Sequence, residues 1–351
     1  MKSRLKALTQ IITASKLDAL LINSDTNIRY LTDFPASESW LLVTKSGKSY
    51  YITDSRYTLE AKAGLKGIVV KEYKKSFFTT LADLLRKNNC KHLGFDESHY
   101  TVTQYKGLKT KLAKVVQLRP ANGFVEQLRV IKDDSEIKQI KEALKIHAKA
   151  LKYLKKQVKP GVTEQDCLMK LEQYVKRAQV GFSFDPIIAS GPNSCLPHAH
   201  VSRRKIKNNE PVLIDMGIDI KGYKSDLTRM FFLGRIPTLV AETCAIVSEA
   251  QRRAIIKIGP GVLASEVDQE ARKYLKFFKL DKYFGHSLGH GVGLDIHEAP
   301  RLAPTSNTVL QPGMIITVEP GVYIPHKFGI RIEDMVLVTD KGYEILSDNI
   351  D

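Results

Sequence analysis

The sequence predicts an α/β protein with two domains, and three observations lead to this prediction. The chain has 351 residues, which is enough for about two domains of ordinary size. Short apolar strand patterns alternate with helical patterns over residues 1–122, as in a mixed α/β domain. Within residues 123–351 one order of elements occurs twice. We therefore expect one domain in residues 1–122 and a second, internally duplicated one in residues 123–351.

The first domain is predicted to be a sheet covered by helices. Four apolar residues share one face of the first predicted helix, namely Leu5, Leu8, Ile11 and Ile12. The predicted strands cover residues 18–23, 39–44, 49–53 and 91–95. The second and third strands flank the turn sequence Lys45-Ser-Gly-Lys48, which indicates a hairpin, and a helix is expected at 54–63. The N-terminal segment lacks the apolar run and cleavage site of a secretion signal, so we expect it to belong to the fold.

The duplication in the second domain is read from two similar helix ends. A helix predicted from Ser135 to about Val158 stops at Pro160-Gly161-Val162, because proline and glycine commonly end helices. Another helix predicted at 241–258 stops at Pro260-Gly261-Val262. Each stop is followed by a predicted capping pair that opens a further helix. The two pairs are Thr163 with Asp166, and Ser265 with Asp268.

Composition and charge exclude several classes of protein. Apolar residues make up 43% and charged residues 26%, as in ordinary globular chains. No apolar run approaches the ~20 residues that cross a membrane. The net charge is +16, which invites a nucleic-acid interpretation. However, the lysines are scattered among acidic residues and no DNA- or RNA-binding motif occurs, so we expect neither nucleic acid nor membrane as a partner.

The cysteines favour a reducing compartment. Four are present, at 90, 167, 195 and 244, and none is close to another in the sequence. This spacing is typical of free thiols and not of a disulfide framework. We therefore expect a cytoplasmic protein.

Two acidic residues lie where the two strands of one predicted hairpin of the second domain are joined. Asp215 lies at the end of the apolar strand 212–217, and Asp226 lies at the beginning of the strand 225–232. Antiparallel strands joined in this way can direct both carboxylates to the same face.

Two further acids lie in apolar strands after the second repeat. Glu319 ends one predicted strand and Glu333 lies within the next, and these strands cover residues 313–319 and 329–338. A buried carboxylate without a partner is unfavourable, so all four acids need a cation. Only Arg229 and Arg331 lie nearby in the sequence. Metal ions are therefore the simplest partners.

A loop rich in glycine and histidine separates the two acidic pairs. It contains His286, His290 and His297 within residues 284–298. It is no dinucleotide-binding fingerprint, because no strand precedes it and no helix follows it. Four carboxylates with imidazole suit a pair of divalent ions such as Mn, Co, Fe or Zn. Two such ions about 3.5–4 Å apart can hold a hydroxide and polarise a carbonyl oxygen.

Together these motifs resemble one family. The order of Asp215, Asp226, the Gly-His-Gly-Val-Gly loop at 289–293, Val-Glu319-Pro-Gly and Arg-Ile-Glu333-Asp is similar to the pita-bread metallopeptidases (peptidase family M24). The resemblance is strongest to the prolidase and Xaa-Pro aminopeptidase branch. It covers essentially the whole chain, because motifs of the first domain, such as residues 27–31 and 53–57, resemble the creatinase-type N-terminal domain of that branch. It implies a pita-bread catalytic domain of two pseudo-symmetric halves.

The resemblance also implies a role for each site residue. Asp215 would hold one metal ion, His290 with Glu319 the other, and Asp226 and Glu333 would bridge both. Glu319 would also be the catalytic base. His297 would contact the scissile peptide, and His198 would bind substrate and shuttle a proton. Residues that would line the substrate site are His286, Tyr323 and Arg331. His200 is expected to be a neighbour only.

The implied function is a dinuclear aminopeptidase that cuts the Xaa-Pro bond at peptide N-termini through a metal-bridging hydroxide. Manganese is the expected ion, with Co, Zn or Fe as alternatives, and a homodimer is expected. An Xaa-Pro dipeptidase acting on proline dipeptides is the main alternative. Three others are ranked lower, namely a methionine aminopeptidase, a creatinase-like enzyme and a metal-free binding protein on the same fold. The five retained ligand positions argue against the last two.

Overall fold

A computed structural model describes residues 2–350, and these divide into two compact units between Arg129 and Val130. The division lies beyond residue 122, because a short helix at Glu126–Arg129 packs with the first unit. Arg129 Nη1 donates to Asn27 Oδ1 over 2.8 Å, and the side chain of Asn27 donates to Glu126.

The first unit contains one six-stranded sheet in the order β4-β3-β2-β1-β5-β6. Its strands are β1 (Ala19–Ile22), β2 (Trp40–Thr44), β3 (Ser49–Thr53), β4 (Val69–Glu72), β5 (His92–Phe95) and β6 (Gln117–Pro120). Its helices are α1 (Lys2–Ala14), α2 (Asp25–Thr32), α3 (Ser55–Gly64), α4 (Phe77–Lys87), α5 (Val102–Leu112) and α6 (Glu126–Arg129). The predicted helices, strands and β2–β3 hairpin are confirmed.

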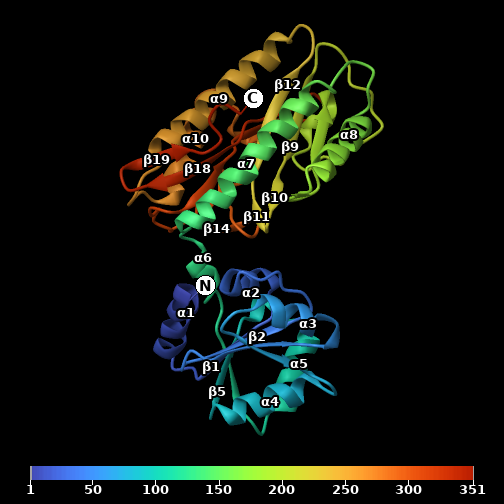
Figure 1. Ribbon diagram of the computed structural model, residues 1–351. Helices are drawn as coiled ribbons and strands as arrows, with labels where there is room; N and C mark the ends of the chain where they lie inside the picture. Colours follow the sequence, from blue (N-terminus) through green and yellow to red (C-terminus); the bar gives the residue numbers. More distant parts are fainter. Residues whose placement is uncertain (1, 351) are drawn as a thin grey trace. The chain divides into compact units, whose positions relative to one another are not determined.

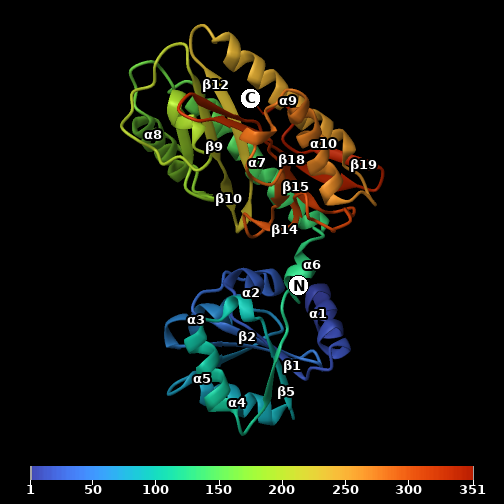
Figure 2. The ribbon, with the colours of Figure 1, turned by 180° about the vertical axis from the view of Figure 1, so that it is seen from behind.

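Helices cover both faces of this sheet. Figure 2 shows α1 and α2 on one side of the strands and α4 and α5 on the other. Because side chains alternate along a strand, Ala19 and Leu21 of β1 point to the same core as Leu85 of α4 and Leu108 of α5.

The second unit carries two related halves. The first half contains α7 (Asp134–Lys155), α8 (Glu164–Arg177), β7 (Gly181–Phe182), β8 (Ile187–Ser190), β9 (Pro211–Met216), β10 (Ile218–Ile220), β11 (Tyr223–Lys224) and β12 (Leu227–Phe232). The second contains α9 (Thr238–Lys257), α10 (Ala264–Phe277), β13 (Gly289–Gly291), β14 (Glu298–Leu302), β15 (Ile315–Val318), β16 (Gly321–Ile324), β17 (Phe328–Arg331), β18 (Asp334–Thr339) and β19 (Gly342–Ile345). In each half two helices precede three antiparallel strands, ordered β8-β9-β12 and β13-β15-β18.

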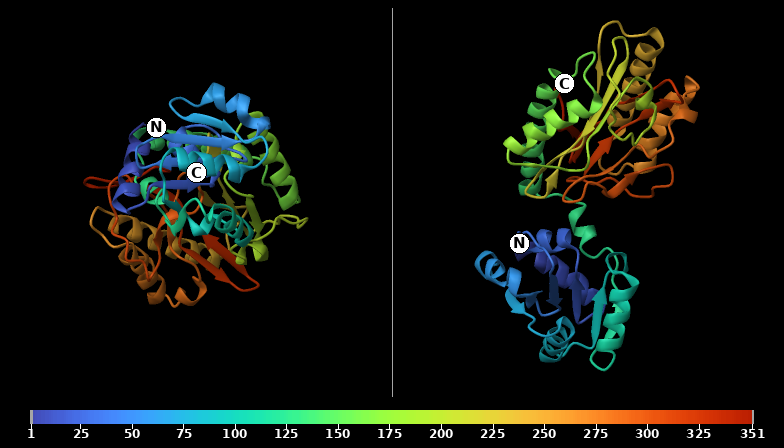
Figure 3. Two further views of the ribbon diagram at one scale, coloured as in Figure 1. Left: turned by 90° about the horizontal axis from the view of Figure 1, so that it is seen from below. Right: turned by 90° about the vertical axis from the view of Figure 1, so that its right-hand side faces the viewer.

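The helix pairs lie on opposite flanks of these strands (Figure 1; Figure 3, right). Each pair has its own apolar core. Leu151 of α7 and Leu171 of α8 pack against β9, whereas Ala250 of α9 and Ala271 of α10 pack against β15. The strands that carry the acidic residues are thus fixed from both flanks.

The two Pro-Gly stops make the same hydrogen bonds, which confirms the predicted duplication. Gly161 N donates to Ile206 O over 2.8 Å, and Ile206 N donates back to Val162 O. In the second half Gly261 N donates to Leu310 O over 2.9 Å, and Leu310 N donates back to Val262 O. Both glycines have φ close to +90° (89° and 87°), which favours glycine over other residues.

Two local predictions in this unit were wrong. The helix α10 is capped by Leu263 and not by Ser265, and Asp268 lies one turn inside the helix with its carboxylate bound to Arg272. The strand predicted at 329–338 is two strands, β17 and β18, that belong to different sheets and leave Glu333 between them. By contrast, Thr163 and Asp166 form the predicted capping box of α8.

Two chemical expectations can also be compared with the structure. All four cysteines are free. Among the described residues no helix is long and apolar enough to pass through a bilayer.

Candidate active site

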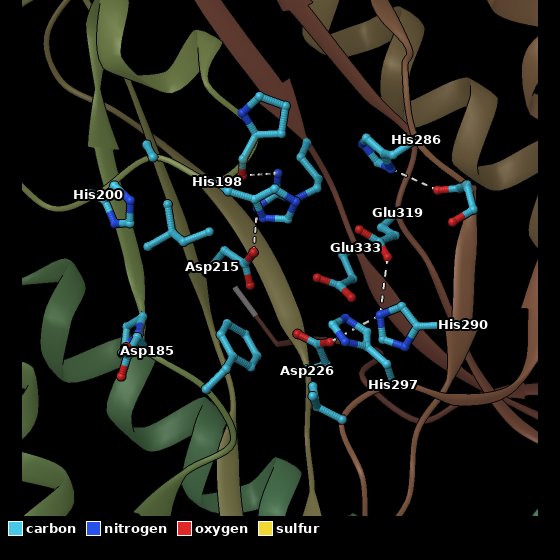
Figure 4. A pocket seen from close by; sticks show the side chains of 18 of the residues that line it. Asp185, His198, His200, Asp215, Asp226, His286, His290, His297, Glu319 and Glu333 are labelled. Carbon is cyan, nitrogen blue, oxygen red and sulfur yellow. Dashed lines mark hydrogen bonds and ion pairs between the residues drawn. The ribbon is translucent and has the colours of Figure 1, made fainter. Parts of the chain in front are cut away.

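One pocket of about 1250 Å³ lies between the two halves of the second unit. Nine of the ten predicted site residues line it, namely His198, Asp215, Asp226, His286, His290, His297, Glu319, Arg331 and Glu333. Figure 4 labels eight of these nine residues and shows their side chains around this pocket. His200, expected to be only a neighbour, also lines it.

The four carboxylates occupy equivalent places in the two halves. Asp215 lies near the end of β9 and Asp226 directly before β12, the antiparallel partner of β9. Glu319 directly follows β15, and Glu333 directly precedes β18, the partner of β15. Each pair of strands therefore brings two acids to one of its ends, which the sequence had suggested only for Asp215 and Asp226.

His290 lies on β13 in the orientation of a metal ligand. Its Nδ1 donates to Gly291 O over 3.1 Å, so Nε2 keeps its lone pair. Nε2 lies 3.4 Å from Glu319 Oε1 and 3.6 Å from Asp226 Oδ2. Burial lowers the pKa of His290 to about 4, so the imidazole is neutral, the form that binds metals. Ligand atoms of Asp226, His290 and Glu333 lie within 4.8 Å of one another.

The electrostatics of the carboxylates fit a bound cation. Burial, and then repulsion by neighbouring carboxylates, raise the pKa values of Asp226 and Glu333 well above the usual range. Burial also raises the pKa of Glu319 to about 8. Among these four carboxylates, two buried oxygens have no hydrogen-bond partner within residues 2–350, Asp215 Oδ1 and Glu333 Oε1. Buried oxygens of this kind need either a proton or a metal ion.

One arginine offsets part of this negative charge. The guanidinium of Arg331 donates to the carboxylate of Asp215, and its Nη1 lies 2.7 Å from Tyr323 Oη. Arg229, the other cation considered from the sequence, instead pairs with Asp334 at 2.8 Å. A single arginine cannot balance four carboxylates, so the donor set fits additional divalent ions.

Tyr323 is the predicted site residue that does not line the pocket. It is buried, and its hydroxyl lies between Arg331 and His286. His286 Nδ1 donates to Ser287 O over 2.8 Å, so its Nε2 accepts the Tyr323 hydroxyl proton over 3.0 Å. Burial lowers the pKa of His286 to about 4 and raises that of Tyr323 to about 12. Both groups therefore stay neutral near pH 7.

His297 and His198 also line the pocket, and neither binds a carboxylate within residues 2–350. The ring of His297 stands edge-on to that of His290, with centroids 4.4 Å apart, and burial lowers its pKa. The imidazole of His198 is exposed and makes no hydrogen bond or ion pair within residues 2–350.

Two threonines that were not predicted from the sequence fix the carboxylates. Thr228 Oγ1 donates to Glu333 Oε2 over 2.9 Å and accepts from Arg331 Nε. Thr317 Oγ1 lies 3.3 Å from Glu319 Oε1 and accepts from the backbone N–H of His290. Thr317 is two residues from Glu319, the acid that it contacts, and this spacing could have identified it. Thr228 contacts Glu333, 105 residues away, so no local spacing indicates that contact.

Arg301 is a third residue that was missed. It lies on β14 and lines the pocket, and its Nε donates to Ser287 Oγ over 3.2 Å. Its guanidinium is exposed and makes no ion pair within residues 2–350. A free guanidinium at a pocket can bind a carboxylate through two hydrogen bonds.

Comparisons with known proteins agree with this arrangement. Metallopeptidase family M24 matches residues 138–340, and the Creatinase/Prolidase N-terminal domain matches residues 4–131. A protein of Pyrococcus furiosus named Xaa-Pro dipeptidase is 36% identical over 349 residues, which cover 99% of this chain and 98% of the relative.

Two solved structures share the whole fold. An Xaa-Pro dipeptidase from Bacillus anthracis has a TM-score of 0.94 and 35% identity, covering 99% of this chain and 97% of that one. An X-Pro aminopeptidase from Thermotoga maritima has a TM-score of 0.88 and 32% identity, covering 95% and 96%. Both halves of the second unit and the whole first unit are thus accounted for, and the chain belongs to metallopeptidase family M24, in the branch that carries a Creatinase/Prolidase N-terminal domain.

Proposed function

We propose that this enzyme is a dinuclear metal-dependent aminopeptidase that hydrolyses the Xaa-Pro bond at the N-terminus of peptides. One observation carries the proposal. Four carboxylates and one neutral imidazole converge on a single pocket, and two of the buried carboxylate oxygens there have no partner. Relatives named for Xaa-Pro substrates support the choice of bond.

The residues divide into two sets of ligands. Asp215 would hold one ion, His290 with Glu319 would hold the other, and Asp226 and Glu333 would be shared between the two. When bound, the ions supply an acidified water and a Lewis acid for the peptide carbonyl. Mn is our first choice, and Co, Zn or Fe also suit carboxylate and imidazole ligands.

The remaining groups handle substrate and protons. Glu319 is positioned to accept a proton in the pocket, because Thr317 Oγ1, 3.3 Å from its Oε1, orients the carboxylate. His297 can donate a hydrogen bond to the carbonyl oxygen of the scissile peptide as negative charge develops there. His198, exposed at the pocket, can carry a proton to or from the proline nitrogen. Tyr323 fixes the orientations of His286 and Arg331 from behind.

The main alternative is an Xaa-Pro dipeptidase, and Arg301 is the observation that favours it. A dipeptide presents its proline carboxylate close to the scissile bond, where an unpaired arginine can bind it. A longer peptide has a neutral amide at this place. If the chain is a dipeptidase, Arg301→Met should raise KM for Ala-Pro by at least about tenfold, the usual scale for losing a charged hydrogen-bonded contact. It should leave the KM for Ala-Pro-Xaa peptides unchanged if the chain is an aminopeptidase.

The test of the substrate compares Ala-Pro, Ala-Pro-Xaa and Ala-Ala-Xaa with the Mn-loaded protein. An Xaa-Pro bond is a tertiary amide without an N–H, and its ring fixes φ near −65°. A pocket built for it should favour the proline substrates by at least about tenfold, or ~1.4 kcal/mol. Equal rates on Ala-Pro-Xaa and Ala-Ala-Xaa would contradict the proposal. Activity on Ala-Pro alone would establish the dipeptidase.

Two further expectations accompany this function. Four free thiols suit a reducing compartment, so we propose a cytoplasmic location. We also propose a homodimer, which light scattering on the purified protein would test by its molar mass.

A further inference from the structure

A single buried carboxylate holds both ends of the loop that carries His198. Glu164, in the first turn of α8, is fully buried. Its Oε1 accepts from the backbone N and the hydroxyl of Ser190, both over 2.7 Å. Its Oε2 accepts from the backbone N and the hydroxyl of Ser202, over 3.1 and 2.6 Å. The amide of Asn193 donates to both oxygens.

This arrangement matters because His198 cannot fix its own position. Its imidazole makes no hydrogen bond within the described residues, so the backbone of residues 190–202 decides where it lies in the pocket. The opposite half also contacts this loop, because Gly329 N donates to Ser194 Oγ over 2.8 Å and Arg331 Nη1 donates to Pro197 O over 3.2 Å.

In the second half a buried carboxylate also holds the loop that carries His286. Asp268, on α10, is fully buried and accepts from the backbone N of Leu288 over 3.1 Å. It also binds Arg272 Nε at 2.7 Å, and Arg272 Nη1 donates to Phe284 O. The carboxylate and its arginine thus hold residues 284 and 288, which lie on either side of His286.

We propose that Glu164 and Asp268 are positioning residues, the first for His198 and the second for His286. The assignment of catalytic consequence rests on the proposed function, in which both histidines serve the substrate pocket. Neither carboxylate lines that pocket, so each acts only through the loop that it holds.

The chemistry of the donors explains why Glu164 must be a carboxylate. Five donor groups point at its two oxygens, and each oxygen of a carboxylate is an acceptor only. Glutamine has the same size, but its amide NH₂ would face serine and backbone donors at one end of the loop. Glu164→Gln should therefore release either Ser190 or Ser202 without changing the volume of the core.

The first experiment needs no activity. Hydrogen exchange of the Mn-loaded protein, followed by mass spectrometry, should be faster over residues 190–202 in Glu164→Gln and unchanged over 284–288. Asp268→Asn should show the reverse. The matched control is Asp166→Asn, which weakens the capping box of α8 in the same helical turn but does not touch the loop. Equal acceleration of both loops in every variant would refute the proposal, even if the protein proved to have another substrate.

The second experiment links each carboxylate to its histidine. Glu164→Gln should lower kcat/KM for an Xaa-Pro substrate by about ten- to a hundredfold, the scale expected for a misplaced catalytic group. This loss should largely vanish when His198 is already alanine, but should persist in full beside His286→Ala. Asp268→Asn should show the opposite pattern. Losses that multiply in all four combinations would mean that the carboxylates only stabilise the fold.

If Glu164→Gln does not fold, Ser202→Ala takes its place in both experiments, because it removes one of the hydroxyl groups that donate to Glu164.

Discussion

The two carboxylates proposed to be shared between the metal ions should matter most for metal binding and activity. Asp226 and Glu333 lie at equivalent places before β12 and β18, and each is close to the ligands of both halves. We predict that Asp226→Asn and Glu333→Gln will each lower metal content below two ions per chain and remove most activity. The reason is that an amide has neither the charge nor the two acceptor oxygens of a carboxylate.

Metal analysis by mass spectrometry of the purified variants would test this prediction. The control is Asp219→Asn, because Asp219 pairs with Lys224 at the tip of the same hairpin, away from the pocket. Two ions per chain and normal turnover in either pocket variant would show that the carboxylate is not shared between ions.

His297 gives a different prediction, because it is assigned to the substrate and not to the metal. His297→Ala should keep both ions but lower kcat by roughly a hundredfold, as when a positioned donor to a developing oxyanion is removed. Metal content and kcat measured on the same preparation separate the two roles. A loss of metal in this variant would make His297 a ligand.

Sequence reasoning found the metal-ligand candidates but not the residues that orient them. Asp215 and Glu319 were recognisable because an acid at the end of an apolar strand is unusual. By contrast, Arg301, Glu164 and the buried position of Tyr323 depend on contacts between segments far apart in the chain. Ser202 and Glu164, for example, are 38 residues apart, and no local pattern predicts their contact.

The strands β13 and β15 lie so close together at Gly289, next to His290, that a side chain has no room there. A methyl group built on Gly289 would lie 2.0 Å from Thr317 O, a backbone atom of β15 that cannot turn away. We predict that Gly289→Ala lowers the free energy of unfolding by about 1–3 kcal/mol, the usual cost of overpacking. It should also weaken metal binding, because it displaces the strand that carries His290.

The same loop offers the control for this prediction. Gly285 has no atom within 4 Å of the place where its Cβ would be, so Gly285→Ala should change neither stability nor metal content. Urea denaturation of both variants, with and without metal, would measure the difference. Equal stability of the two would show that β13 and β15 can move apart at little cost.

Element boundaries were predictable where local chemistry decides them and not where tertiary contacts do. The Pro-Gly stops and the capping box at Thr163 follow from backbone geometry, and the structure confirms them. The cap predicted at Ser265 was wrong. Leu263 forms an isolated antiparallel β-bridge with Val309, and this contact makes α10 begin directly after Leu263. The break at Glu333 has a similar cause, since β17 and β18 join different sheets.

The pocket contains several buried carboxylates. When metal is removed, their protonation determines how the stability of the second unit depends on pH. Without metal, burial raises the pKa of Glu319 to about 8 and those of Asp226 and Glu333 above their usual range. In the unfolded chain these groups release their protons near pH 4. Between these values the folded protein therefore binds protons that the unfolded chain has lost.

The sign of the pH effect follows directly. Where the folded state binds more protons, the free energy of unfolding falls as pH rises, by about 1.4 kcal/mol per pH unit for each such proton. Burial lowers the pKa of His286 and His290 to about 4, which acts in the opposite direction but only below about pH 6.5, where unfolded histidine is protonated. The three carboxylates act over the whole interval, so we predict that the chelator-treated protein is less stable to urea at pH 7.5 than at pH 5.5. Metal ions replace these protons, so the Mn-loaded protein should lose much less stability over the same interval. Triple replacement of Asp226, Glu319 and Glu333 by amides should abolish this loss of stability, and the buried histidines should then make stability rise between pH 5.5 and 7.5. A metal-free wild-type protein with equal stability at both pH values would mean that the carboxylates stay charged in the folded state, and that Arg331 and the surrounding donors suffice to hold them.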